Sequence, residues 1–392
     1  MRSRPVRRAT KFVLPAVAGV VVVGALSASS CAGDIVVGPR PQAVDDRFVA
    51  EPPGIAVESW VEGLKAPWSL VFLPDGRALV SERAGRIRLI ADGTLRPAPF
   101  AALDVATGGE GGLMGLALHP AFPDPPYLYA MRTVRVDGSR TNQVTRLVLD
   151  GGTARVDKTV FAGIPGARNH NGGRIAFGPD GMLYVATGEI FEADLAQDRA
   201  SLGGKVLRLT PDGAVPPDNP DPASPVYSLG HRNVQGLAWQ PETGDLFLSE
   251  HGPSGEFLLG AYDEVNVGVP GGNFGWPRAV GAPGLGGLVD PLVAWPEVTA
   301  APSGIAFWHG DLYVAALRGA ALIRIALDRA AGAWRVTAVE RWFNDDDNGV
   351  LGRLRDAVVG PDGALYVLTS NRDGRGDPRP GDDKILRLSR AP

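Results

Sequence analysis

Cysteine is almost absent from this sequence, which has one such residue, Cys31, among 392. Without a second cysteine the chain has no internal disulfide to rely on. No long stretch repeats apolar residues at helical spacing either, so long amphipathic helices are not expected. Glycine and proline, by contrast, are abundant, with 52 and 34 residues spread through the chain. This composition favours many short strands joined by turns.

A basic stripe is also missing. The formal net charge is −4, and it falls to −9 when residues 1–30, which carry five basic and no acidic side chains, are removed. An acidic chain without a basic stripe is not expected to bind nucleic acid. The apolar share of 44% and the charged share of 21% are normal for a globular protein and argue against wholesale disorder. At 392 residues the chain has room for two or three average domains or one large all-β domain.

The first 30 residues have the features of an export signal. A basic segment, Arg2 to Lys11, precedes an apolar segment, Phe12 to Leu26, which is too short and too interrupted for a membrane span. The following Ala28-Ser29-Ser30-Cys31 resembles a bacterial lipobox, in which the cysteine becomes the lipidated first residue. We therefore expect residues 1–30 to be a lipoprotein-type signal peptide and Cys31 the first mature residue. An ordinary signal peptide with an incidental cysteine is the alternative.

This N-terminus leads us to expect a protein exported to the periplasm or cell surface, with the membrane touched only through a lipid anchor at Cys31. Residues 31–54 are rich in Pro, Gly and Asp and show no period. We expect them to form a flexible tether. Regular structure is expected to start near Ile55.

From there one theme recurs six times: a turn, often Pro-Asp-Gly, followed by a short apolar strand. The six strands are ALVSE, YLYAM, MLYVATGE, DLFLSE, DLYVAAL and ALYVLTSN, about 50 to 70 residues apart. Several copies continue into a second strand that we expect to end the blade, namely GRIRLI, KVLRL, ALIRIAL and KILRL. Repeats of strand pairs at this period predict a propeller. We predict that residues 55–392 form an all-β, six-bladed β-propeller with four-stranded antiparallel blades. A parallel β-helix is the runner-up, but its repeat would be much shorter.

The segment Ala167–Glu189 contains the first candidate for chemistry. A polar turn that includes His170 precedes two apolar runs split by Pro179-Asp180-Gly181, a combination typical of a β-hairpin. A histidine on such a loop can titrate near neutral pH and act as a general base. The alternative is a histidine that only hydrogen-bonds its own turn.

Other polar clusters interrupt the blade pattern, and ring closure would bring the loops beside the inner strands together in a funnel. Arginines from several repeats that point into one funnel suit a planar or multiply anionic ligand, although each could instead form a salt bridge. A Gly-Pro pair with a nearby aspartate offers oxygens to a calcium ion, or makes an ordinary turn. The residues of these clusters are Glu110, His231, Arg232, Asn233, Gly252, Pro253, Asp263, Arg318, Arg353 and Arg355.

Between about Val57 and Leu388 the chain resembles the soluble quinoprotein glucose dehydrogenases and aldose sugar dehydrogenases of the glucose/sorbosone dehydrogenase family. The motifs that carry the resemblance occur in order: PWSLVFLPDG, GGLMGLALHP, RNHNGGRIAFGPDG, LGGKVLRL, GHRNVQGLAW, SEHGP, DEVN, GGNFGWP and RLRDAVVGPDG. The resemblance implies a six-bladed propeller that binds pyrroloquinoline quinone (PQQ) and calcium in its funnel. It also implies oxidation of an aldose at C1 to a lactone, with hydride transfer to the quinone and an electron acceptor that the sequence does not identify.

The resemblance also implies roles for single residues. His170 matches the general base that takes the proton of the sugar C1 hydroxyl, and Asp263 matches a carboxylate that orients it. Arg232 and Asn233 match residues that contact the quinone oxygens.

The remaining implied roles concern the ends of the cofactor. The backbone carbonyls of Gly252 and Pro253 match calcium ligands. Arg353 and Arg355 match the arginines that hold the PQQ carboxylates.

The chain departs from the family pattern at two positions that are expected to contact the cofactor. Glu110 lies where members often have Gln, and Arg318 lies where the glucose enzymes have Lys. The loop between Gly252 and Asp263 also differs in length. Two rival functions stay open: a calcium-dependent lactonase, which needs no arginine cluster, and a non-enzymatic surface propeller that binds glycans or proteins.

Overall fold

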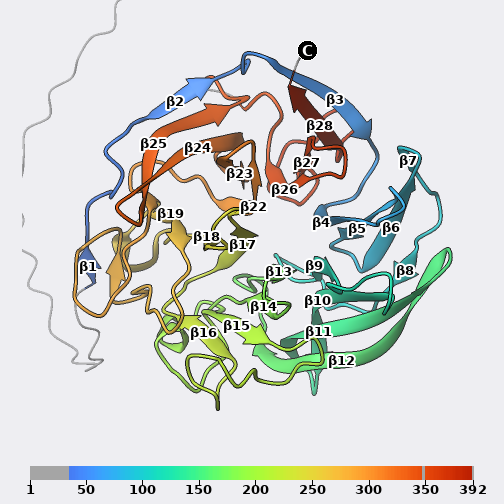
Figure 1. The fold of residues 1–392 in the computed structure, drawn as a ribbon, viewed down its shortest axis with the longest axis horizontal. Coiled ribbons are helices and arrows are strands. Elements are labelled where there is room, and N and C mark those ends of the chain that lie inside the picture. Colours follow the sequence, from blue (N-terminus) through green and yellow to red (C-terminus); the bar gives the residue numbers. More distant parts are fainter. Residues whose placement is uncertain (1–34, 347–348, 391–392) are drawn as a thin grey trace, which may run out of the picture. The chain divides into compact units, whose positions relative to one another are not determined.

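The computed structural model describes residues 35–346 and 349–390, and in this part nearly all regular structure is β-sheet. The sheets form six blades around a central axis, as the sequence predicts (Figure 1). Helical structure in the described part is limited to two short 3-10 turns, η1 (Ala193–Ala196) and η2 (Glu256–Leu258). None of its helices has the length and apolar character needed to cross a bilayer. The expected signal peptide and Cys31 lie outside the described residues.

The first three blades follow one another along the chain. The strands of blade 1 are β4 (Pro67–Phe72), β5 (Ala78–Glu82), β6 (Arg86–Ala91), β7 (Thr94–Leu95) and β8 (Ala101–Ala102). Those of blade 2 are β9 (Leu113–Leu118), β10 (Tyr127–Val136), β11 (Ser139–Asp150) and β12 (Thr153–Pro165). Those of blade 3 are β13 (Ile175–Phe177), β14 (Leu183–Ala186), β15 (Lys205–Leu209) and β16 (Val226–Leu229).

The last three blades complete the ring. The strands of blade 4 are β17 (Val234–Trp239), β18 (Leu246–Glu250), β19 (Asp263–Val267) and β21 (Val293–Trp295). Those of blade 5 are β22 (Pro302–Trp308), β23 (Asp311–Ala316), β24 (Ala321–Ala330) and β25 (Ala333–Trp342). Those of blade 6 are β26 (Leu354–Val359), β27 (Leu365–Thr369), β28 (Ile385–Arg390) and β3 (Ile55–Val61). Because β3 pairs with β28, the start and the end of the propeller share one sheet.

The six copies of the sequence theme are the second strands of the six blades. Several are buried along their whole length, as in β5, β18 and β27, because a neighbouring blade covers each face. The strands that we expected to end the blades are the third strands, so this part of the prediction was wrong. The fourth strand is the outermost one of its blade; in blades 2 and 6 this strand, β12 and β3, is mostly exposed, and exposure removes the apolar pattern.

The predicted tether also needs correction for its described residues, because part of it is paired. Strand β1 (Val36–Val37) runs parallel to β20 (Ala279–Val280), and β2 (Asp46–Val49) adds a parallel edge strand to β25. Between them, the Gln42 amide donates to the Ala294 carbonyl at 2.8 Å and accepts from the Ala294 N–H at 3.1 Å. Strands of two and four residues are too short to show a period in the sequence.

Apolar packing holds the blades together. In the described part of the chain, six apolar clusters lie one between each pair of neighbouring blades. Between blades 3 and 4, for example, Tyr184 and Val206 pack against Val234 and Leu248. A blade cannot bury both faces alone, so closure of the ring supplies the core.

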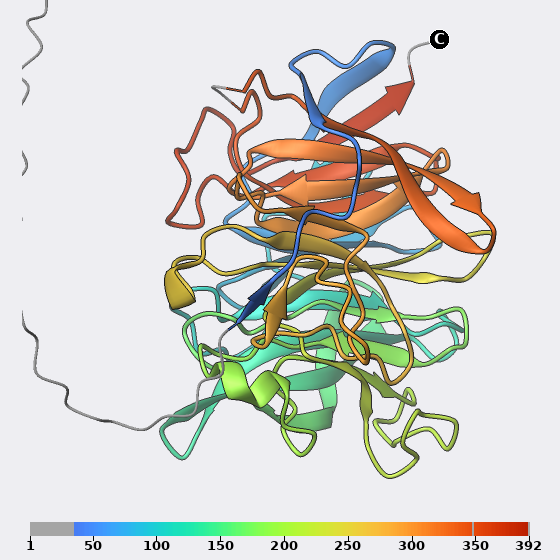
Figure 2. The same cartoon turned by 90° about the vertical axis from the view of Figure 1, so that its left-hand side faces the viewer.

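The antiparallel order of each blade decides where its loops emerge. Loops that lead into an innermost strand and loops between the second and third strands leave the ring at the same end. The Pro-Asp-Gly turns, such as the one between β13 and β14, lie at the other end. Figure 2 shows the ring from its side, with η1 and η2 both at one edge. The polar clusters of the sequence therefore gather at one end of the propeller.

Candidate active site

A pocket of about 280 Å³ lies at this end of the ring and receives loops from blades 2 to 6. Six of the residues predicted for the site line it: Glu110, His170, Arg232, Asp263, Arg318 and Arg353. Ring closure thus brings together residues that are up to 243 positions apart in the sequence, as the propeller prediction required.

The His170 side chain is held at one ring nitrogen and open at the other. Its Nδ1 lies 2.7 Å from Oε1 of Glu189, and its ring stacks on Phe191 with centroids 3.7 Å apart. Its backbone N–H donates to Oε2 of Glu110 at 2.9 Å. No described residue hydrogen-bonds to Nε2. A carboxylate at Nδ1 favours the tautomer with the proton on that atom, which leaves Nε2 as an acceptor that faces the pocket.

The carboxylate that orients His170 is therefore Glu189, and the expectation for Asp263 was wrong. Asp263 instead accepts backbone N–H groups from Gly252, Ala300 and Ala301 at 2.9, 2.7 and 2.8 Å. Burial raises the pKa of Asp263, and these three hydrogen bonds and the charge of Arg232 oppose the rise. Asp263 holds two loops of the pocket wall together.

Glu189 could have been found from the hairpin. In the structure Ile175 pairs with Val185, and continuing that register brings residue 189 opposite residue 171, beside His170. The motif match alone gave no register, and so it could not identify this partner.

Arg232 is 1% exposed and lies in the wall between blades 3 and 4. It ion-pairs with Glu256, donates from Nη1 to the His251 carbonyl at 3.2 Å, and has Nε 3.9 Å from Glu189. Asn233 lies behind the pocket rather than on it, and its side-chain oxygen accepts the Gly172 N–H at 2.9 Å. Asn233 thus supports the His170 loop.

The two arginines of blade 6 lie at different depths. Arg353 lines the pocket and pairs with Asp373 at 2.9 Å. Arg355 lies deeper, where Nη1 donates to the Gln235 side chain at 2.9 Å, and burial lowers its pKa to about 9. Arg318 is exposed on the rim and has no ion pair within residues 35–346 and 349–390.

The carbonyl oxygens of Gly252 and Pro253 accept no hydrogen bond from another described residue. Both residues line a narrow cavity beside the main pocket, together with Arg232 and Glu250. Among the described residues no group of three or more His, Cys, Asp or Glu side chains is arranged to hold a metal ion. A calcium ion here would depend on these two carbonyls and on oxygens of a ligand.

Sequence reasoning missed Phe191, His251 and Arg375, which line the pocket, and Glu189, which lies behind His170; all four follow second strands of blades. Burial lowers the pKa of His251 to about 3, so that imidazole is neutral at physiological pH. Arg375 donates to Oε1 of Glu110 at 2.7 Å. An alignment of the six second strands would have pointed to the polar residues that follow each.

Neighbouring charged groups determine whether the Glu110 carboxyl is ionised. Burial by itself would raise the pKa of this carboxyl. His251 in the cationic form that it takes at acidic pH, together with Arg375 and His170, outweighs burial and lowers the pKa to about 2. Glu110 is therefore an anion at physiological pH, fixed between His170 and Arg375. The negative charge that distinguishes it from Gln is compensated by Arg375.

The fold and the site define a six-bladed propeller whose end pocket combines a carboxylate-bound imidazole with four arginines, Arg232, Arg318, Arg353 and Arg375. A family model described as Glucose / Sorbosone dehydrogenase matches residues 64–387. The chain belongs to this family.

Named relatives agree with this membership. An aldose sugar dehydrogenase of Escherichia coli (strain K12) is 33% identical over an alignment 358 positions long, which covers 83% of this chain and 92% of the relative. Quinoprotein glucose dehydrogenase B of Acinetobacter calcoaceticus is 28% identical over an alignment 417 positions long, which covers 79% of this chain and 84% of the relative. The PQQ-bound structure of an aldose sugar dehydrogenase from Streptomyces coelicolor is 43% identical, with a TM-score of 0.75, and covers 86% of this chain and 99% of its own.

Proposed function

We propose that this protein oxidises aldose sugars at C1 to lactones, with PQQ as cofactor, calcium beside it and His170 as general base. The enzyme class, a quinoprotein sugar oxidoreductase, follows from the family and from the PQQ-bound and quinoprotein relatives. The observation that carries the proposal is the Nε2 of His170, which is open to a pocket with four arginines while Glu189 holds Nδ1.

The donor set of the pocket fits PQQ, a planar molecule with several carboxylates and carbonyls. Arginine pairs with carboxylates in two parallel hydrogen bonds, and Arg318 is exposed on the rim without an ion pair to any described residue. Arg232 lines the pocket, and its buried Nε has no hydrogen-bond partner in the described part of the chain. Buried polar groups are normally hydrogen-bonded, so this atom supports a ligand rich in acceptors. When bound, PQQ supplies the two-electron acceptor that the side chains lack.

The proton that leaves the sugar during oxidation is taken up by side chains of this protein. Nε2 of His170 accepts the proton of the sugar C1 hydroxyl, and Glu189 stabilises the imidazolium that forms. The His170 residue is 5% exposed and covered by Phe191, so few water molecules compete for Nε2. Arg232, also buried, adds a cation that stabilises negative charge developing in the pocket.

The free carbonyls of Gly252 and Pro253 support the placement of calcium at the Arg232 side of the pocket. A lactonase would need a ring of carboxylate and amide side chains around its cation. The described residues form no cluster of three or more His, Cys, Asp or Glu side chains for a metal, which argues against that alternative.

Reconstitution tests the proposal. The purified full chain is stripped of cofactor, PQQ and calcium are added, and reduction of an artificial dye is followed with a panel of aldoses. We expect a change in PQQ absorbance on binding, and sugar-dependent dye reduction that a calcium chelator abolishes. Absence of both the absorbance change and the dye reduction would overturn the proposal in favour of a binding module.

A further inference from the structure

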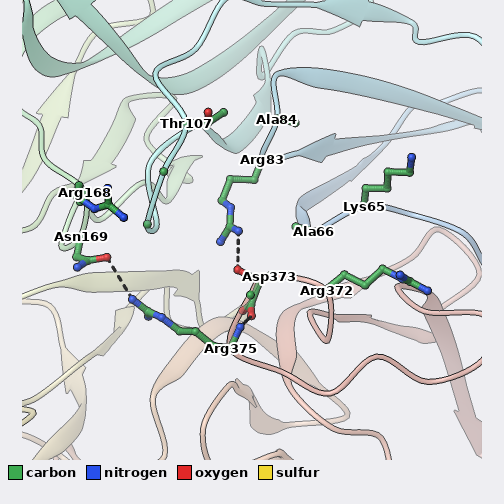
Figure 3. Close-up of a pocket in the computed structure, with 13 residues that line it drawn as sticks. Lys65, Ala66, Arg83, Ala84, Thr107, Arg168, Asn169, Arg372, Asp373 and Arg375 are labelled. Carbon is green, nitrogen blue, oxygen red and sulfur yellow. Dashed lines mark hydrogen bonds between the residues drawn. The ribbon is translucent and has the colours of Figure 1, made fainter.

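A second pocket, of about 610 Å³, lies beside the candidate active site at the same end of the ring (Figure 3). Asn169 and Arg375 line both pockets, so the two cavities share one wall. In Figure 3, Arg83, Arg168 and Arg375 reach this second pocket from three separate loops. Neither the mechanism above nor the family motifs give it a role.

The second pocket is strongly cationic. Five basic side chains line it: Lys65, Arg83, Arg168, Arg372 and Arg375. One carboxylate lines it, that of Asp373, and Arg353 already binds this group at 2.9 Å. The whole chain carries a net charge of −4, so the cluster is not part of a generally basic surface.

Several of these cations lack a counter-ion. The side chains of Lys65 and Arg168 are exposed, and neither forms a hydrogen bond or ion pair within the described part of the chain. Arg83 is half-buried, and its guanidinium donates to the backbone carbonyl of Asp373 at 2.7 Å. Burial lowers the pKa of Arg83, a sign that its charge is incompletely compensated. Arg372 likewise donates to a backbone carbonyl, that of Asp382, at 2.6 Å.

The wall between the two pockets connects this cluster to the candidate base. Arg375 donates to Glu110 at 2.7 Å and to the Asn169 side chain at 3.2 Å, and Glu110 accepts the His170 N–H at 2.9 Å. At Gly109 a Cβ would lie 2.2 Å from the Arg168 carbonyl oxygen, so only glycine lets the two loops meet this closely. The cationic pocket is therefore fixed relative to His170.

We propose that the second pocket binds an anionic group of the sugar, so that the substrates are aldoses with a carboxylate or phosphate remote from C1. This inference rests on the function proposed for the neighbouring pocket. A neutral sugar would leave Lys65, Arg83 and Arg168 without a counter-ion, whereas a carboxylate or phosphate can receive two or more of their N–H groups. Hexuronic acids and sugar phosphates are the classes that match.

Kinetics of the reconstituted holoenzyme test the preference. Glucuronate and glucose 6-phosphate share their C1 chemistry with glucose and differ at C6, and glucuronamide is the neutral isostere of glucuronate. We expect a higher kcat/KM for the two anionic sugars than for the two neutral ones. In the double variant Lys65→Gln/Arg168→Gln the ratio of kcat/KM for glucuronate to that for glucose should fall about 10-fold, because two partly screened charges are lost. The matched control Arg335→Gln, on the exposed outer strand β25, should keep the ratio.

Binding of methyl glucuronide, which has no free C1 hydroxyl, separates this inference from the proposed function. Calorimetry with wild type and the double variant should show binding that depends on Lys65 and Arg168 and weakens with salt. Oxidation of glucose without preference for anionic sugars, and no methyl glucuronide binding, would overturn the inference and leave the proposed function. Methyl glucuronide binding in a holoenzyme that oxidises no sugar would overturn the proposed function and support the anion site.

Discussion

Blades 3 and 4 each place a histidine against a glutamate 19 residues further along the chain. In blade 3 the pair is His170 and Glu189, and in blade 4 it is His231 and Glu250. Both pairs join Nδ1 to a carboxylate oxygen at 2.7 Å, and both histidines precede the innermost strand of their blade. The repeat itself therefore produces the carboxylate-bound imidazole.

The two pairs differ at the other ring nitrogen. Nε2 of His231 lies 2.8 Å from the Ser228 hydroxyl, and the ring stacks on Phe274 with no exposed surface. Nε2 of His170 has no hydrogen-bond partner in the described part of the chain and faces the pocket. The comparison teaches that packing makes one copy structural, while an open Nε2 makes the other available for chemistry.

Among variants that test the difference between the His170 and His231 pairs, His170→Ala is expected to have the largest effect on turnover. Loss of the general base should lower kcat by about 10²–10⁴-fold while PQQ stays bound. Dye reduction and PQQ absorbance measure the two quantities. Near-normal turnover would remove His170 from its proposed role.

His231→Ala is the matched control. It leaves Glu250 and Ser228 buried without their partner, so the free energy of unfolding should fall by about 1–3 kcal/mol. The kcat of the folded protein should change far less than in His170→Ala. Equal losses of turnover in the two variants would show that both pairs are structural.

Glu189→Gln gives the next largest expected effect. The amide cannot stabilise an imidazolium and can hold the wrong tautomer, so kcat should fall by about 10²-fold. The KM for sugar should change little, because Glu189 is 1% exposed and lies behind His170. Steady-state kinetics separate the two parameters, and a rise in KM alone would contradict the positioning role.

Glu110→Gln tests a feature that only the His170 pair has, a carboxylate from another blade on its backbone N–H. The pKa of Glu110 is lowered from 4.5 to about 2 in the folded protein. A lowered folded pKa stabilises the protein above the unfolded pKa, and this stability is lost as the pH falls toward 2. Between pH 5 and pH 3 the stability advantage of wild type over Glu110→Gln should shrink by about 2 kcal/mol. Urea unfolding at each pH measures it, and a constant difference would show that Glu110 does not titrate this way.

The fold was predictable because the second strands are covered on both faces and read as short apolar runs. Strands at the outer edge of the ring could not be predicted in this way, because β3 and β12 are mostly exposed and β1 has only two residues. The positions of β3 and β1 also depend on pairing with the distant strands β28 and β20, which no local pattern encodes.

The candidate site likewise contains residues that sequence motifs identify and residues that they do not. Loops before innermost strands carry long motifs, so His170, Arg232 and Arg353 were found from sequence. Glu189 and Arg375 lie after second strands, and their contacts with His170 and Glu110 depend on strand register and ring closure. The orienting carboxylate was therefore assigned to Asp263, which shares the pocket but binds backbone instead.

The smallest expected effect concerns Ser228, whose hydroxyl occupies Nε2 of His231. Ser228→Ala leaves that nitrogen buried without a partner, which should lower the free energy of unfolding by about 1 kcal/mol. Turnover should not change, because Ser228 and His231 are fully buried and do not line the pocket. Urea unfolding and dye reduction on the same preparation measure both. A fall in turnover in Ser228→Ala would show that the His231–Glu250 pair contributes to catalysis. Burial of His231 would then not be enough to explain the difference between the two histidines.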